Sequence, residues 1–308
     1  MALTDNAKGA LLMMGSMAAF TVNDTFMKAL AGDLPLAQAI FLRGFATSAA
    51  MLALARAMGQ LRLRLPRRDL GLLALRTAGE IGAVYFFVTA LFNMPLANAT
   101  AILQALPLAV TLAGAVVFRE ALGWRRLTAI LVGFAGVLLI VRPGSEGFTI
   151  YSLYVLAAVA CVTVRDLAVR RMSGALPSLT VAFVASAGVT VTFGLVAAVQ
   201  PWAPVSAASA GLLLGAAGSI LLAYILSVTA MRVGELAVVA PFRYTGLVVA
   251  LILGYVVFGD WPTPLTLVGA TLVVGTGAFT LWRERQLARA AAGTVPRKPR
   301  VDTPPDSL

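Results

Sequence analysis

Apolar stretches of about 20 residues recur ten times along the chain and alternate with short polar connections. Because an α-helix rises about 1.5 Å per residue, each stretch can cross a hydrocarbon core of roughly 30 Å. The pattern predicts an all-α integral membrane protein with ten transmembrane helices. The predicted spans are approximately 9–30, 35–55, 70–91, 95–118, 124–141, 149–171, 178–199, 206–230, 236–258 and 263–282.

Composition supports this class and narrows the chemistry. Hydrophobic residues make up 60% of the chain and charged residues 12%, unlike a typical soluble domain. The net charge of +11 falls mostly in the connections between spans, so we expect no nucleic-acid partner. Histidine is absent and the lone cysteine, Cys161, lies in an apolar span. We therefore expect neither a metal site nor a cofactor.

The distribution of arginine predicts the topology. Basic residues gather after the even-numbered spans, as at Arg56, Arg119 and Arg171, and again in the C-terminal tail. By the positive-inside rule, both termini are predicted to be cytoplasmic. Residues 292–308 are rich in proline and charge and have no apolar face, which predicts a disordered cytoplasmic tail.

The two halves of the chain resemble each other. VNDTFMK (22–28) aligns with VRDLAVR (164–170), and GEIGAVY (79–85) aligns with GSILLAY (218–224). Five spans separate equivalent positions, so the halves must insert in opposite orientations. Equivalent polar residues are Asp24 and Asp166, Lys28 and Arg170, and Tyr85 and Tyr224.

This symmetry predicts two inverted five-helix repeats, 9–142 and 149–285. Inverted repeats are typical of secondary carriers, which bind substrate near the membrane midplane between the halves. The chain also lacks a GxxxxGK[ST] phosphate loop, which argues against direct use of ATP.

Several of these stretches resemble the drug/metabolite transporter superfamily, specifically its ten-helix EamA-type members. The resemblance rests on FTVNDTFMKALAG, FLRGFATS, LANATAILQALPLAVTLAGAVVFRE and APFRYTGLVVALILGYVVFGDWPT, and it extends roughly over residues 8–285. It implies a multi-pass carrier of small metabolites in a bacterial inner membrane.

Within that superfamily, the pattern ND…K in span one, GAAGS in span eight and APFRY in span nine is similar to S-adenosylmethionine uptake carriers of intracellular alphaproteobacteria. Other members export aromatic amino acids, threonine or homoserine, or import riboflavin. Cargo and direction of transport therefore stay open, as do proton or exchange coupling and oligomeric state.

Charged residues inside the predicted spans are the first candidates for function, because a charge at membrane depth must find a partner or water. Asp24 of span one and Arg43 of span two are predicted to lie close enough to interact. Lys28, one turn beyond Asp24, is an alternative partner. The pair either locks the two helices together or acts as a gate or proton-coupling group.

A second group lies in the other repeat. Arg243 is about 12 Å from the predicted inner face and is expected, with Tyr244, to line a cavity. Asp166 is its predicted partner, although Asp166 also fits a solvated helix end among neighbouring arginines.

Glu80 departs from the superfamily pattern, which has an apolar or small residue at this position. It either pairs with Arg76 one turn earlier or binds substrate or a proton. Tyr85 and Tyr224 are candidate ligand contacts near the midplane, and packing is the alternative.

Pro107 and Pro241 lie inside spans four and nine, where each removes a backbone donor and predicts a hinge or a static kink.

The sequence thus favours a secondary transporter for a small molecule, S-adenosylmethionine-like or amino-acid-like. The alternatives are an exporter of amino acids or drugs on the same scaffold, an integral-membrane enzyme and a channel.

Overall fold

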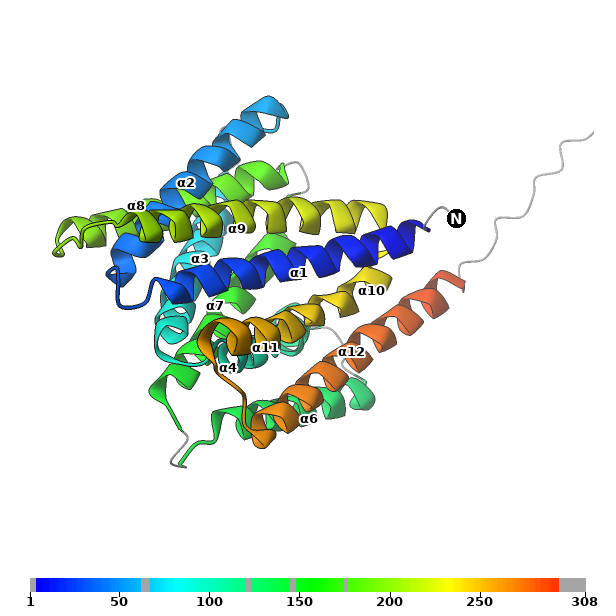
Figure 1. Cartoon of the computed structure of the whole chain (residues 1–308). Coiled ribbons are helices and arrows are strands. Elements are labelled where there is room, and N and C mark those ends of the chain that lie inside the picture. The colour runs from blue at the N-terminus through cyan, green and yellow to red at the C-terminus, as the bar shows by residue number, and fades with distance from the viewer. Residues whose placement is uncertain (1–3, 62–66, 120–122, 145–147, 174–176, 294–308) are drawn as a thin grey trace, which may run out of the picture.

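The computed structural model describes residues 4–61, 67–119, 123–144, 148–173 and 177–293, and all regular structure in these ranges is helical. The predicted tail, 292–308, lies outside the described residues from 294 onward. The helices are α1 (Asp5–Ala29), α2 (Leu36–Ala57), α3 (Arg67–Asn93), α4 (Leu96–Leu103), α5 (Leu106–Phe118), α6 (Trp124–Val141), α7 (Ile150–Arg171), α8 (Ser178–Ala198), α9 (Ala207–Val233), α10 (Leu236–Val239), the 3₁₀ turn η1 (Ala240–Tyr244), α11 (Thr245–Phe258) and α12 (Pro264–Gly293) (Figure 1).

The helices confirm the predicted membrane fold. Within the described ranges, nine helical stretches from α2 onward are long and apolar enough to cross a membrane. In this count, α4 and α5 together form one stretch, and η1 and α11 together form another. The tenth pass is α1, which is less apolar because its second half carries Asn23, Asp24 and Lys28. Helices α9, α11 and α3 all pack against α1, so these polar groups face protein rather than lipid.

Helix pairing follows the internal repeat. The repeat makes α1 equivalent to α7 and α3 equivalent to α9. Accordingly, α1 packs along α9 and α3 packs along α7, while the remaining extensive pairs, α2 with α8 and α6 with α12, each join a helix to its own equivalent. This is the arrangement expected of two intertwined, inverted five-helix repeats, as predicted.

The fourth and ninth spans are each interrupted, and the two interruptions touch. Span four turns at Gln104 between α4 and α5, and span nine tightens into η1. The Gln104 side-chain amide donates a hydrogen bond to the Tyr244 carbonyl at 3.5 Å. Pro107 and Pro241 occupy the first turns of α5 and η1, where a missing N–H is tolerated. The prolines therefore begin the second segment of each interrupted span.

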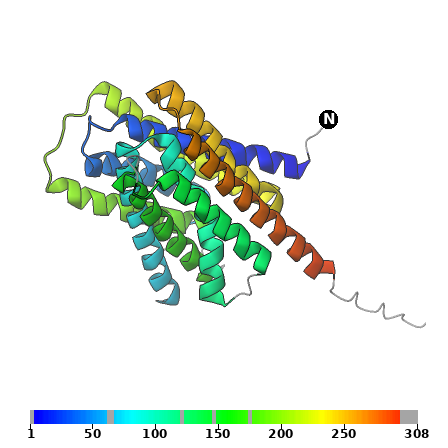
Figure 2. The same ribbon diagram turned by 90° about the horizontal axis from the view of Figure 1, so that it is seen from below.

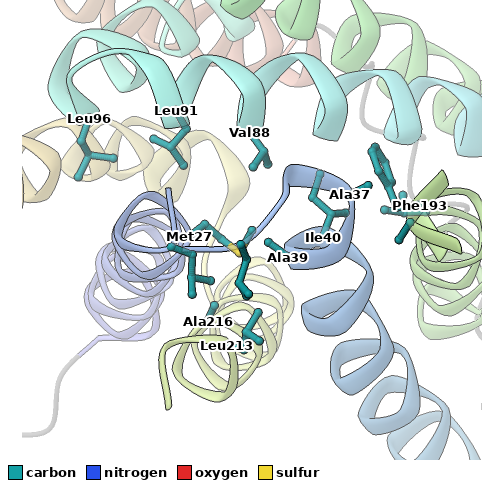
Figure 3. Close-up of a cluster of buried hydrophobic side chains, with 14 of the residues drawn as sticks. Met27, Ala37, Ala39, Ile40, Val88, Leu91, Leu96, Phe193, Leu213 and Ala216 are labelled. Atoms are coloured by element: carbon teal, nitrogen blue, oxygen red, sulfur yellow. The ribbon is translucent and has the colours of Figure 1, made fainter. Parts of the chain in front are cut away.

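Apolar packing is concentrated at one end of the bundle. Helix α1 begins and α12 ends at the same end, here called the terminal end (Figures 1 and 2). At the opposite end, Met27, Ile40, Leu91 and Phe193 belong to a large buried cluster to which α1, α2, α3, α4, α8, α9 and α11 contribute (Figure 3). A second cluster joins the adjoining parts of α4, α6, α7 and α12. Only a small cluster centred on Met13 lies near the terminal end among the described residues.

Candidate functional site

A polar cavity lies between α2, α3, α8 and α9, and extends from the middle of these helices toward the terminal end. Its volume is about 50 Å³, which is room for a few water molecules. Arg43, Arg76 and Glu80 supply its charged lining, and Tyr224 supplies an aromatic ring and a hydroxyl. Thr47 and other small or apolar side chains complete the wall.

Glu80 is the centre of an ion-pair cluster. Arg165 of α7 donates from Nη1 to both Glu80 carboxylate oxygens, at 3.1 and 3.4 Å. The predicted partner, Arg76, also forms an ion pair with Glu80, but at 3.9 Å. Arg165 in turn donates from Nε to Asp166 at 2.9 Å. The cluster therefore ties α3 to α7 at the cavity wall.

Close approach of α3 and α7 positions this cluster. A Cβ atom added at Gly79 would lie 2.9 Å from the Cys161 carbonyl oxygen and 3.2 Å from Cβ of Arg165. Gly82 is similarly close to the Cys161 sulfur. Small residues let membrane helices approach backbone to backbone, and here this brings Glu80 within reach of Arg165.

Arg76 has unused hydrogen-bonding capacity. Its side chain is 11% exposed, and its Nε and Nη1 atoms are buried without a hydrogen-bond partner. A guanidinium group carries five donors in a planar fork that fits carboxylate oxygens. Arg76 can therefore accept an anionic group that reaches the cavity.

Arg43 and Asp24 are linked through a third residue. Arg43 donates to the Asn23 side-chain oxygen at 3.4 Å, and the Asn23 amide nitrogen donates to Asp24 at 2.9 Å. The opposite charges of Asp24 and Arg43 attract each other, as predicted, but no ion pair within 4.0 Å joins them directly. A single asparagine fills the gap because its amide both accepts and donates.

Lys28 does not pair with Asp24, so the alternative pairing of these two residues is wrong. Its ammonium group donates to the carbonyls of Met94 and Leu91 at 2.7 and 3.3 Å, at the end of α3. It also lies 5.2 Å from the centre of the Phe258 ring. Lys28 thus joins α1, α3 and α11 at the end opposite the termini.

Arg243 and its predicted partner Asp166 attract each other through their charges but form no direct ion pair. Asp166 is bonded to Arg165, and no ion pair within 4.0 Å joins Asp166 to Arg243. Arg243 is exposed although it follows α10 inside a predicted span, which fits a cation facing water. Its neighbour Tyr244 is 6% exposed and packs against Gly277 of α12. The predicted cavity-lining role thus fits the position of Arg243 but not that of Tyr244.

The two repeat-related tyrosines have different surroundings. Tyr224 lines the cavity, and its ring meets Phe20 edge to face at 5.5 Å between centroids. Tyr85 is 41% exposed and packs on Phe86 and Tyr154, away from the cavity lining. Of the pair, only Tyr224 is in position to contact a solute in this cavity.

Arg165 and Asn23 are site residues that the sequence analysis missed. The repeat alignment offers a signal, because Asn23 and Arg165 are equivalent and each precedes an aspartate. Arg165 is not singled out by the sequence because Arg170 and Arg171 follow it, and the three arginines together indicate a solvated helix end. In the described part of the chain, no three His, Cys, Asp or Glu side chains gather as a metal site would need.

Comparison with known families decides the class. The EamA-like transporter family matches residues 7–142 and 149–282. The chain belongs to this family. It is accordingly a multi-pass membrane protein of the drug/metabolite transporter superfamily, and the family's members point to a small-molecule substrate.

Several characterised relatives of this EamA-family protein are carriers. It is 26% identical to the S-adenosylmethionine uptake transporter of Rickettsia prowazekii, over 92% of this chain and 96% of the relative. The pseudopaline exporter of Pseudomonas aeruginosa is 27% identical over 86% of this chain and 93% of its own length. The riboflavin transporter of Vibrio cholerae is 28% identical over 64% and 67%, respectively.

A solved crystal structure shares the fold of this EamA-family protein. It is 21% identical, with a TM-score of 0.63, and the match covers 91% of this chain and 98% of the other.

Proposed function

We propose that this EamA-family protein is a secondary transporter of the bacterial inner membrane that moves an S-adenosylmethionine-like or amino-acid-like metabolite by alternating access. Both termini are assigned to the cytoplasm on the distribution of arginine. The two repeats, 9–142 and 149–285, are the halves between which the substrate passes.

One observation carries the substrate class: groups of both charges line one cavity together with an aromatic ring. Arg43 and Arg76 offer guanidinium donors to a carboxylate, and Glu80 offers a counter-charge to a cation. The Tyr224 ring supplies a face for an aromatic or cationic group. A metabolite that carries an α-amino acid and a second positive centre satisfies all of these groups.

The shape of the bundle suggests which state this is. The apolar clusters close the end opposite the termini, and the polar cavity reaches toward the terminal end. With cytoplasmic termini, this arrangement corresponds to an inward-facing conformation with a cavity of about 50 Å³. The interrupted spans, which touch at Gln104 and Tyr244, are natural points of bending during exchange between states.

The test is counterflow with purified protein in proteoliposomes. Vesicles are preloaded in turn with S-adenosylmethionine, phenylalanine, threonine or riboflavin, and uptake of the labelled form of each solute is measured at two external pH values. We expect trans-stimulated, saturable uptake of S-adenosylmethionine. Saturation and trans-stimulation distinguish a carrier from a channel, and the pH response reports on proton coupling.

Two controls make this result specific. Empty vesicles give the leak rate, and an Arg43→Ala protein that is inserted and monodisperse should show little counterflow. Trans-stimulation by phenylalanine or threonine but not by S-adenosylmethionine would move the assignment to an amino-acid carrier. Silence for all four solutes would contradict the proposed substrate class.

A further inference from the structure

An acidic side chain, Glu80, lines the cavity, and this carboxylate is already paired with a cation of the protein itself, Arg165. Glu80 is the only carboxylate among the described residues that line the cavity. In this conformation its oxygens accept from Arg165 at 3.1 and 3.4 Å. Any cationic solute that uses Glu80 must therefore compete with that guanidinium group.

The internal repeat shows that this ion pair is not a requirement of the helix packing. Helix α1 packs along α9 as α3 packs along α7. At the equivalent point of that interface, Ser219 replaces Glu80 and Asn23 replaces Arg165. One interface forms with neutral groups at this point and the other with charged groups, so packing of the helices does not by itself require a charge on α3.

Arg165 can leave Glu80 without becoming an unpaired charge. Its Nε atom is held by Asp166 at 2.9 Å, and the Asp166 side chain is 34% exposed. Removing a partner from a buried ion pair is costly when the remaining charge has no other partner, and here a second carboxylate remains. The guanidinium group can therefore withdraw toward Asp166 when another cation arrives.

We infer that Glu80 is the counter-charge for a fixed positive group on the substrate, and that Arg165 holds this carboxylate while the cavity is empty. The inference rests on the proposed transport function and adds the group that sets charge specificity. With a volume of about 50 Å³, the cavity admits water but no metabolite, so loading requires the wall to open. Exchange of Arg165 for the substrate cation couples binding to that opening.

Neighbouring groups fit the rest of such a substrate. Arg76, whose Nε and Nη1 atoms lack partners, faces the same cavity and suits a carboxylate. The Tyr224 ring suits a sulfonium or ammonium group by cation–π attraction. The substrate class is thus a metabolite with an amino-acid end and a permanent positive charge.

The test compares two solutes that differ by one methyl group and one charge. S-Adenosylmethionine carries a sulfonium, and S-adenosylhomocysteine is the neutral thioether. Competition of each with labelled S-adenosylmethionine is measured in proteoliposomes containing the full-length protein. For the wild type we expect S-adenosylmethionine to compete about tenfold or more better, because attraction between the sulfonium charge and the Glu80 carboxylate needs to contribute only about 1.4 kcal/mol for a factor of ten.

Substitution of Glu80 gives the decisive comparison. The preference is the ratio of the competing concentrations of S-adenosylhomocysteine and S-adenosylmethionine. Glu80→Gln should bring this ratio close to one, and Glu80→Asp, which keeps the charge, should retain part of the preference. Asp5→Asn, which removes an exposed carboxylate outside the cavity, is the matched control and should keep the wild-type preference. An unchanged preference in Glu80→Gln, or none in the wild type, would overturn the inference. Absence of S-adenosylmethionine transport by the wild type would instead overturn the proposed function.

A second variant tests the competition itself. Arg165→Gln removes the closer of the two cations paired with Glu80 and leaves Arg76 at 3.9 Å, so half-maximal uptake should require less S-adenosylmethionine than in the wild type. A requirement that is unchanged or higher, in a protein that remains monodisperse, would contradict displacement of Arg165 by substrate. This measurement stands if Glu80→Gln fails to fold.

Discussion

Lys28 and Arg170 occupy equivalent positions in the two repeats, and each places its cation over a phenylalanine that is itself one of an equivalent pair. The Lys28 ammonium lies 5.2 Å from the Phe258 ring centre, and the Arg170 guanidinium lies 4.8 Å from that of Phe118. Because the repeats are inverted, the two contacts lie at opposite ends of the bundle. Each joins the first helix of one repeat to the fourth span of the other.

Weakening either contact should bias the carrier toward opening at that end. A cation–π contact is worth roughly 0.5–2 kcal/mol, enough to shift an equilibrium several-fold. Phe118→Leu should increase access to the cavity from the terminal side, and Phe258→Leu should increase it from the opposite side. The measurement is labelling of a Ser186→Cys reporter in the cavity wall, in a Cys161→Ala background, by an impermeant thiol reagent applied to each side of vesicles.

The opposite signs provide the control for this prediction. Leucine keeps most of the apolar volume, so both variants should insert and purify like the parent. If both substitutions change labelling in the same direction, the two contacts are not alternating closures of the two ends.

Stability measurements should separate the structural part of the Glu80 cluster from its role in specificity. Glu80→Gln leaves Arg165 bonded to Asp166, whereas Arg165→Gln leaves Glu80 with Arg76 at 3.9 Å. Arg165→Gln should therefore lower the thermal midpoint in detergent more than Glu80→Gln does. Both costs should be smaller than the roughly 3–5 kcal/mol typical of a buried charge left alone.

The double variant completes a double-mutant cycle. Glu80→Gln combined with Arg165→Gln places two neutral groups where the other interface has Ser219 and Asn23. The double variant should therefore recover most of the stability lost in Arg165→Gln. It should not recover preference for the charged solute. A larger midpoint loss in Glu80→Gln than in Arg165→Gln would contradict the observed geometry.

Asn23 is predicted to be essential as an amide, because it accepts from Arg43 and donates to Asp24. Asn23→Asp keeps the shape but removes the donor and places two carboxylates side by side. Counterflow should fall at least several-fold. The control is Asn93→Asp, since Asn93 is exposed and donates only to the Thr89 carbonyl within its own helix. Equal counterflow in the two variants would remove Asn23 from the site.

Periodicity and self-similarity were sufficient to predict the ten passes and the inverted repeat, because both depend on patterns local to the chain. The partners of the intramembrane charges were harder. Arg76 lies four residues before Glu80 and could be paired with it from helix geometry, whereas Arg165 reaches Glu80 only because α7 packs on α3 at Gly79.

The tyrosines show a different limit of sequence reasoning. Tyr85 lies five residues after Glu80, which rotates it by about 140° around the helix, so both side chains could not face one cavity. That rotation was available from the sequence. The interruption of span four at Gln104 was available too, because Pro107 cannot donate to the carbonyl of Leu103 and so predicts a kink there. The contact of this kink with Tyr244 of span nine was not available from the sequence.

A final prediction concerns the packing of α12 against the interrupted span nine. A Cβ atom at Gly277 would overlap the Tyr244 hydroxyl and its ring carbon Cζ, whereas one at Gly275 would meet nothing within 4 Å. Gly277→Ala should therefore destabilise the protein by about 1–3 kcal/mol, more than offsetting the gain in helix propensity. The measurement is the thermal midpoint in detergent, followed by size-exclusion chromatography.

Two further variants make the cause of that loss specific. Gly275→Ala adds the same methyl group two residues earlier and should leave the midpoint unchanged or slightly higher. Tyr244→Phe removes a buried hydroxyl that has no hydrogen-bond partner, so alone it should cost little, and combined with Gly277→Ala it should recover part of the loss. If Gly275→Ala and Gly277→Ala lower the midpoint equally, the defect lies in α12 itself and not in its contact with Tyr244.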